Sequence, residues 1–441
     1  MKRILFLTLI TINLTMILTA QDLSGSWSLN RCIDYARENN IQVQQARLGI
    51  QENEAYFKQA KAERLPGLSA QATQSFTSDK TLNPLSGNYE NQDYHYGNYS
   101  LGTDVILFNG FRINNNISQK ELSLQSSELA VQVTQNNIEI AVTQAYLAIL
   151  YANESVKQAQ QTLEGSEVQL EWAKNHYEAG SIAEADFAQI RSQYITDRYS
   201  LTVAENEFSR FVLQLKQLLE LGIDQELKLD FPEVPDEQVQ KAIPGKTEVY
   251  SQALQIMPEV KSGDLGIDIA DLEYRKSGAN FLPSLSMSAS IGTGYNTIST
   301  DSYSLQLDHG LNEYIGLKLN IPIFSNRTNK TVKELARINI DQSRLNLENT
   351  RKDLLESVEQ AYLDAVTSRS RFEAAGEQLN ASELSYKLTE EQYSLGLKNT
   401  VDLITEKNKY LLAQQEYLQA KYSAILNYKL LDFYQGKEIQ L

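Results

Sequence analysis

The sequence predicts a mainly α-helical protein with a membrane β segment, built from one structural unit that occurs twice. Three observations carry this prediction. Short motifs recur at a nearly constant offset, two long stretches lack proline and show helical periodicity, and four short segments alternate apolar and polar residues. Together they indicate a repeated order of helix, two strands, long helix and short helix.

The repeat is clearest in a Tyr-Gly-Asp motif. "YEAGSIAEADF" begins at Tyr177, and "YSLGLKNTVDL" begins 216 residues later at Tyr393. "VTQAYLAIL" and "VEQAYLDAV" are separated by the same offset, whereas "RLPGLS" with Pro66 and "FLPSLS" with Pro283 are 217 residues apart. An offset held along most of the chain indicates duplication of a whole unit rather than a chance motif.

The N-terminus has the form of a secretory signal peptide. Lys2 and Arg3 precede an apolar run over 4–18, and Thr19-Ala20 closes the segment. The alternative is a membrane anchor, but the run is short against the roughly 20 residues of a spanning helix. No later segment is apolar enough for such a helix, so a membrane protein with this sequence would span with strands.

The repeat divides the chain into a signal peptide at 1–20, a first repeat at 21–221, a Pro-containing linker or equatorial segment at 222–246 and a second repeat at 247–441. Each repeat begins with a helix, which in the first copy runs up to Pro66. The elements that follow are two strands, a long helix and a shorter helix. They are expected at 66–78, 94–108, 112–178 and 184–221, and again at 283–297, 313–324, 328–394 and 400–435.

The long helices are unusual in length. Their apolar residues recur at helical intervals, as in Leu129, Val133, Ile140, Leu147 and Tyr151. A helix of about 65 residues would be near 100 Å long, which indicates a coiled coil or a helical tube. Gly165 and Gly376 leave open whether each stretch is one helix or two placed end to end.

The strand segments alternate strictly. In "SLSMSASIGTGY" the apolar residues from Leu285 to Ile291 point one way and the serines point the other. Strands of about ten residues with aromatic residues near their ends are typical of outer-membrane barrels, although a soluble hairpin also alternates. The polar segments "SDKTLNPLSGNYENQ" and "STDSYSLQLDHG" are expected to be the two external loops.

Four strands cannot close a barrel, because known single-chain barrels begin at eight strands. An open sheet edge in lipid would leave unpaired backbone groups, each costing several kcal/mol. The chain is therefore expected to share its barrel with copies of itself. Two copies give eight strands, which side chains fill, and three give twelve, which leaves room for a pore. A homotrimer is the better solution.

Composition excludes several function classes. The net charge of −16 argues against binding nucleic acid. One Cys and three isolated His residues offer neither a Cys-rich zinc site nor another metal cluster. The sequence contains no P-loop, no Gly-rich dinucleotide turn and no nucleophile–base pairing. We therefore expect no catalytic residue, no metal, no cofactor and no enzymatic activity.

The motifs, taken in order, resemble the TolC family of outer-membrane efflux proteins. The resemblance rests on "LNRCIDYARENN", "AERLPGLSAQ", "ANFLPSLSMS" and the two Tyr-Gly-Asp turns, and it covers essentially the whole mature chain. It implies a homotrimer with a shared twelve-stranded β-barrel in outer-membrane lipid on a long α-helical barrel in the periplasm. It also implies a passive duct that is opened by a periplasmic adaptor (a membrane fusion protein) and driven by an inner-membrane pump.

Two alternatives stay open. The same channel would serve as the outer-membrane component of a type I protein secretion system, because the duct wall contacts whatever the pump delivers. A soluble periplasmic coiled-coil scaffold would keep the long helices but make the strands ordinary hairpins.

The repeated turn has an explanation in turn chemistry. Gly180 and Gly396 are expected to end the long helices in the left-handed conformation. Asp186 and Asp402 then lie near the start of the following helices, where the helix dipole favours a carboxylate. Topology adds a second interpretation, since these turns lie at the ends of the helices farthest from the strands. They would form the periplasmic mouth of the duct and the docking point of the adaptor.

The resemblance also implies a gate at these turns. Tyr393 and Lys398 match a Tyr and a basic residue that in the family bond to the first-repeat helix pair and keep the entrance closed, with Asp186 as a candidate partner here. Asp402 matches the first position of an acidic ring that favours cations, and Thr405 replaces the second acid. Lys398 replaces an Arg and loses its bidentate geometry, so we expect a weaker latch and one acidic ring.

Overall fold

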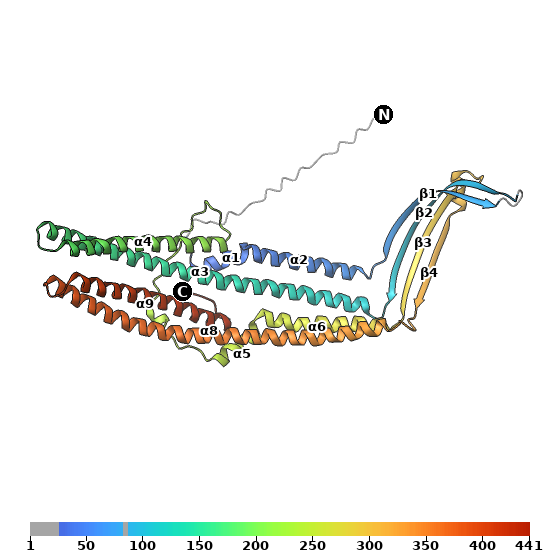
Figure 1. Ribbon diagram of the computed structural model, residues 1–441. Helices are drawn as coiled ribbons and strands as arrows, with labels where there is room; N and C mark the ends of the chain where they lie inside the picture. Colours follow the sequence, from blue (N-terminus) through green and yellow to red (C-terminus); the bar gives the residue numbers. More distant parts are fainter. Residues whose placement is uncertain (1–25, 83–86) are drawn as a thin grey trace, which may run out of the picture.

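The structure is a computed structural model that describes residues 26–82 and 87–441, so the expected signal peptide at 1–20 lies outside the described residues. The molecule is elongated (Figure 1). Two long helices, α3 (Arg112–Glu178) and α8 (Thr328–Ser394), run from a small β-sheet at one end to two helical tips at the other. The shorter helices α4 (Glu184–Leu218) and α9 (Thr400–Tyr434) return from the tips.

Each long helix is continuous. Gly165 lies inside α3 and Gly376 inside α8, so neither glycine divides its helix. A glycine in a helix costs about 1 kcal/mol relative to alanine, and packing against α4 or α9 along the hairpins outweighs that cost. The single-helix alternative is therefore the correct one.

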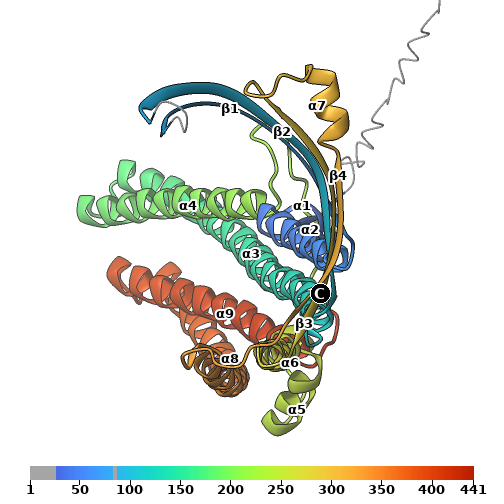
Figure 2. The same ribbon diagram turned by 90° about the vertical axis from the view of Figure 1, so that its right-hand side faces the viewer.

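The sheet contains four antiparallel strands in chain order, and it curves strongly (Figure 2). They are β1 (Gly67–Leu82), β2 (Tyr89–Phe108), β3 (Ser284–Asn296) and β4 (Asn312–Asn320). Because strands of the two repeats pair directly, through β2 and β3, the sheet joins both copies into one surface.

The register places the alternating residues on two distinct faces. Leu317 lies opposite Met287, which lies opposite Val105, so apolar residues continue across three strands. The apolar face comprises Leu68, Ala70, Leu101, Val105, Leu285, Met287, Ala289, Ile291, Ile315, Leu317 and Leu319. Gly316, Ser288 and Asp104 are aligned on the opposite face. The predicted alternation therefore produces one apolar and one polar face.

The first hairpin is longer than predicted. We expected strands at 66–78 and 94–108 with a loop between them, but the ladder continues to the pair Leu82 and Tyr89. Ser78 Oγ donates to Asp93 Oδ1 at 2.5 Å across the strands. Polar residues pair across the two strands and continue the β-ladder, so the change to polar residues did not coincide with the ends of the strands. Within the predicted loop, residues 83–86 lie outside the described residues.

The second hairpin also differs from the prediction. The expected loop contains a helix, α7 (Tyr303–His309), which begins where Ser302 Oγ accepts the N–H of Leu305. β4 ends at Asn320 instead of 324. Pro322 lacks an N–H and cannot continue the ladder, which accounts for the early end.

The first helix of each repeat is divided, although we predicted one helix up to the proline. In the first copy α1 (Leu29–Asn39) and α2 (Ile41–Ala62) meet at Asn40, whose side chain accepts the N–H of the second residue of α2 at 2.9 Å. In the second copy α5 (Lys246–Ile256) and α6 (Pro258–Ala279) meet at Met257, which makes no side-chain cap, and proline occupies the first position of α6. β1 and β3 begin directly after the prolines that follow α2 and α6, as predicted.

The main hydrophobic core lies midway along the molecule, where α1, α3 and the segment between the repeats meet. Trp27 forms a parallel β-bridge with Leu229. The hydroxyl of the buried Tyr146 donates a hydrogen bond to the carbonyl of Asp230 at 2.6 Å. A short 3-10 helix, Asp236–Gln238, lies in the same segment. Cys32 is buried in this core, and burial raises the pKa of its thiol to about 12.

Within the described residues, none of the helices combines the length and the apolar character needed to cross a membrane. The same part of the chain contains no group of three His, Cys, Asp or Glu side chains placed to hold a metal ion.

Candidate functional site at the helix tips

Both long helices end in the same glycine turn. Gly180 has φ +75° and Gly396 has φ +76°, the left-handed conformation that was predicted for them. The N–H of Ser181 donates to the carbonyl of His176 at 2.8 Å, and Leu397 makes the equivalent bond in the second repeat. The position that a Cβ would occupy has no neighbouring atom within 4 Å at either glycine, so backbone conformation rather than crowding requires glycine here.

The two aspartates occupy equivalent positions but have different partners. Asp186 is the third residue of α4, and its Oδ1 accepts the hydroxyl of Thr400 at 2.8 Å. Asp402 is the third residue of α9, and its N–H donates to the Asn399 side chain that caps this helix. Asp186 therefore joins the two tips, whereas Asp402 remains at its own turn.

Lys398 does not reach its candidate partner Asp186. Its Nζ lies 3.8 Å from Oδ2 of Asp402, and both side chains are more than two-fifths exposed. Lys398 stands just before the N-cap Asn399 and Asp402 lies in the first turn of α9, so the pair is local to this turn. An exposed pair of this length contributes at most about 1 kcal/mol. The hydroxyl of Thr400, rather than Tyr393 or Lys398, contacts Asp186.

Tyr393 contacts the first repeat through an aromatic ring. Its ring packs edge-on against Trp172 of α3, with centroids 5.9 Å apart, and Trp172 stacks on His176 at 4.0 Å. The resemblance implied a bond from Tyr393 to the first-repeat helix pair, and the contact observed is apolar. Trp172 was missed, although it is one of two tryptophans in the chain and lies five residues before the repeated turn motif.

A second aromatic contact lies farther along the long helices. Tyr386 of α8 stacks on Tyr410 of α9 and accepts a hydrogen bond from Gln169 of α3 at 3.4 Å. Burial, together with the nearby Glu390, raises the pKa of Tyr386 to about 12. The hydroxyl therefore stays protonated and donates to Glu390.

A buried ion pair connects α4 and α9. Lys407 Nζ lies 2.9 Å from Asp197 Oδ2, and the two side chains are 7% and 4% exposed. Gln193 donates to the other carboxylate oxygen of Asp197 at 2.8 Å. Sequence reasoning missed the pair. The sequence carries a signal for one member only, because Asp197 stands seven positions after the apolar Ile190, where a coiled coil expects another apolar side chain.

We call these four connections between the α3–α4 and α8–α9 hairpins the hairpin seam. They are Trp172–Tyr393, Gln169–Tyr386, Asp186–Thr400 and Asp197–Lys407. A groove of about 450 Å³ lies beside the seam, with Gln193, Asp197 and Asn408 in its lining. Each connection joins one repeat to the other, so the seam fixes the relative position of the two tips.

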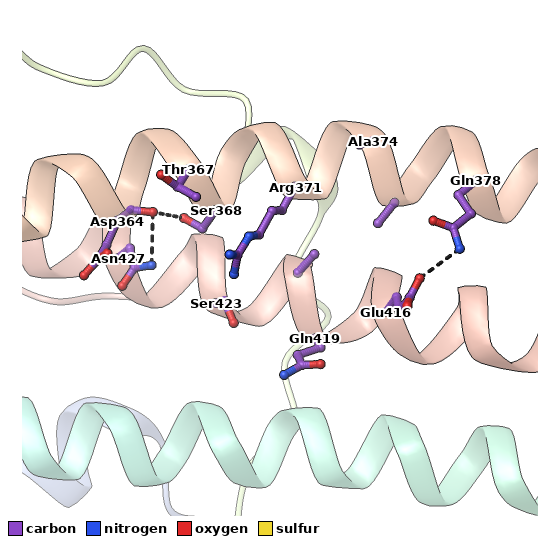
Figure 3. A pocket seen from close by; sticks show the side chains of 12 residues that line it. Asp364, Thr367, Ser368, Arg371, Ala374, Gln378, Glu416, Gln419, Ser423 and Asn427 are labelled. Carbon is purple, nitrogen blue, oxygen red and sulfur yellow. Dashed lines mark hydrogen bonds between the residues drawn. The ribbon is translucent and has the colours of Figure 1, made fainter.

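A second groove, of about 510 Å³, lies between α8 and α9 (Figure 3). Gln378 donates to Glu416 at 2.9 Å on one side, and Arg371 projects into the space between the helices. The lining is polar and open, and its titratable groups do not converge on one point. The arrangement suits a wetted wall better than a reaction site.

Known proteins resemble this chain along both repeats. A family described as "Outer membrane efflux protein" matches residues 32–220 and 249–436, which are the two repeats. The alkaline protease secretion protein AprF of Pseudomonas aeruginosa is 25% identical over 425 residues, covering 91% of this chain and 82% of AprF. The outer membrane protein TolC of Escherichia coli is 24% identical over 359 residues, covering 74% and 72%.

Solved structures with the same fold include CusC, with a TM-score of 0.76 at 20% identity over 93% of this chain and 92% of CusC. VceC from Vibrio cholerae has a TM-score of 0.72 at 15% identity, covering 93% and 97%. Both similarities extend over the sheet, the long helices and the tips together.

Proposed function

Because the chain belongs to the outer membrane efflux protein family, we propose that it is the exit duct of a tripartite efflux system, a passive channel from the periplasm through the outer membrane. The family places it in the outer membrane. The observation that carries the proposal is the match of the family to both repeats, together with the continuous apolar face of the sheet. An adaptor would open the duct at the tips, an inner-membrane pump would supply the energy, and the chain itself would catalyse no reaction.

The proposed barrel requires three chains. The sheet has β1 and β4 as unpaired edges, and three copies joined edge to edge would give twelve strands. The test is the mass of the native species extracted from outer membranes in mild detergent, before and after heating. We expect a trimer that dissociates on heating. A monomer in the soluble periplasmic fraction would contradict the barrel and favour a periplasmic scaffold.

Protein secretion is the second candidate. The similarity to AprF, a protein named for secretion of alkaline protease, favours it. The two functions share the duct and differ in the pump and cargo. Affinity purification of the tagged full-length protein from crosslinked cells would separate them, because an efflux pump and a secretion ATPase are distinct partners.

For the resting duct, we propose that the hairpin seam holds the tips closed. Aromatic packing at Tyr393, the Thr400–Asp186 hydrogen bond and the Lys407–Asp197 ion pair all keep the second-repeat tip against the first. Opening would separate these contacts, with the adaptor binding better to the separated state. Gly180 and Gly396 would shape the surfaces that the adaptor contacts.

Asp402→Asn is expected to reduce the cation preference of single channels by roughly half or more, because rings of carboxylates at a constriction select cations. The Lys398 pair is weak and leaves the Asp402 carboxylate exposed. The measurement is the reversal potential in a planar bilayer under a salt gradient. Asp186→Asn is the matched control, at the equivalent position of the other repeat, and should leave selectivity unchanged. Unchanged selectivity in Asp402→Asn would remove the ring assignment.

A further inference from the structure

The start of α8, directly below the sheet, carries cations that have no acidic partner among the described residues. Lys330, Lys333 and Arg337 lie within the first ten residues of this helix, and we call them the junction patch. The only acid between them, Glu334, pairs with Arg327 at 3.2 Å. None of the ion pairs formed within the described residues involves the three patch cations. In a chain of net charge −16, three such cations are a marked local excess.

Two cations near the same level, and most of those farther along the same helix, are paired with acids. Arg275 and Lys276 at the end of α6 pair with Asp271 and Glu273. Farther down α8, Arg344 pairs with Asp341 and Lys352 with Glu348. Solvent reaches exposed cations in every turn of α8, so solvation alone does not explain why the cations in the first turns lack acidic partners. Among the described residues of α8, Arg371 is the one cation beyond the patch that forms no ion pair, so the unpaired positive charge of this helix gathers in its first turns.

The patch lies on the outer side of the molecule. Lys330 and Glu359 are 29 residues apart, about eight helical turns, so they share a face of α8. Glu359 pairs with Lys246 of α5 at 3.0 Å. Figure 2 shows α5 on the side of α8 that is turned away from the concave face of the sheet. The face that carries the patch therefore points outward, away from the space that the sheet curves around.

Exposed aromatic and aliphatic side chains adjoin the patch. Ile323 and Phe324, in the connection from β4 to α8, are 94% and 84% exposed. Lys333 Nζ lies 5.8 Å from the ring centre of Phe281, which is itself about half exposed. Aromatic residues at the ends of membrane strands lie at the level of the lipid headgroups. Arg337 begins about 14 Å below the start of α8, within reach of the same layer.

We propose that the junction patch binds the phosphate groups of anionic phospholipids in the periplasmic leaflet of the outer membrane. The phosphate supplies the negative charge that the chain does not, and the neighbouring apolar residues enter the edge of the hydrocarbon layer. The contact would fix the height of the barrel in the membrane. This inference rests on the proposed membrane barrel.

The test uses the full-length protein purified in mild detergent and titrated with phosphatidylglycerol or phosphatidylcholine, with bound lipid counted by native mass spectrometry. The wild type should prefer phosphatidylglycerol. Lys330→Gln/Arg337→Gln should raise the apparent Kd for phosphatidylglycerol at least about tenfold, since each cation near an anionic surface contributes about fivefold. The matched control, Arg344→Gln/Lys352→Gln, removes two paired cations from the same helix and should change it less than about twofold.

Three results would overturn the proposal. The first is equal binding of both lipids by the wild type, and the second is an equal loss of phosphatidylglycerol binding in the control variant. The third concerns purified peptidoglycan as another ligand: the patch variant would lose binding to it while keeping phosphatidylglycerol binding. Reconstitution of the wild type into phosphatidylcholine vesicles separates a failure of the lipid-binding proposal from a failure of the proposed barrel. A wild type that fails to enter phosphatidylcholine vesicles contradicts the barrel, whereas one that enters them without lipid preference contradicts only the patch.

Discussion

Lys407→Met is expected to lower the free energy of unfolding by about 3–5 kcal/mol and to raise the fraction of time that the channel is open. The substitution leaves the carboxylate of Asp197 buried between α4 and α9, with Gln193 as its remaining hydrogen-bond donor. A buried charge without its counter-ion is far more costly than the pair was favourable. The closed arrangement of the hairpin seam carries this cost, and separation of the tips relieves it by admitting water to Asp197.

Chemical denaturation gives the stability of the variant, and single-channel recording in a planar bilayer gives its open fraction. Lys409→Met is the matched control, because Lys409 forms an ion pair with Glu406 at 2.7 Å but is 61% exposed. That pair should contribute less than about 1 kcal/mol. Asp197→Leu/Lys407→Met should recover most of the lost stability while the channel still opens more often, because the charge is gone but so is the connection. Equal effects of the Lys407 and Lys409 variants on stability and open fraction would contradict the proposal that the buried Asp197–Lys407 pair holds the tips closed.

The repeat explains why the turns could be predicted and the seam could not. Gly180 and Gly396 follow local rules, since a left-handed residue at a helix end needs only its own turn. Asp197 and Lys407 have no such symmetry. At the repeat offset of 216 residues, Asp197 corresponds to Ala413 and Lys407 to Arg191. The basic residue is thus present in both copies and the acidic one in only the first, so a comparison of the copies does not reveal the pair. Only the packing of α4 beside α9 brings the two side chains together.

The sheet shows the same division between local and long-range information. Alternation along each strand predicted two faces, because side chains of a strand point in alternate directions. Strand ends were predicted less well. Polar pairs extend β1 and β2 beyond the alternating residues, and the partner of each residue depends on a register that alternation does not determine. The fold class therefore followed from periodicity, whereas the lengths of the strands required the structure.

The direction in which the apolar face points can be tested at Leu317. Leu317→Arg is expected to cost about 2–4 kcal/mol per chain if this face contacts lipid at the middle of the membrane. Leu317 is 68% exposed in the single chain, and it lies opposite Met287 within the apolar face. Each of the three chains would place one arginine on the lipid-facing side of the barrel, so the free-energy cost is three times as large in the assembled channel. We expect the amount of heat-labile trimer in outer membranes to fall severely, measured on gels of unheated samples.

Ser288→Arg is the matched control for this prediction. Ser288 follows Met287 on β3 and points to the polar face, where it is aligned with Asp104 and Gly316. An arginine there would lie opposite a carboxylate in a wide, wet interior, so trimer yield should stay near that of the wild type. The two variants add the same side chain at nearly the same depth and differ only in the face that carries it. If Ser288→Arg abolishes the trimer and Leu317→Arg does not, the apolar face lines the interior of the assembly. Because a water-filled duct needs a polar wall, the proposed channel would then be wrong, even though the fold would stand.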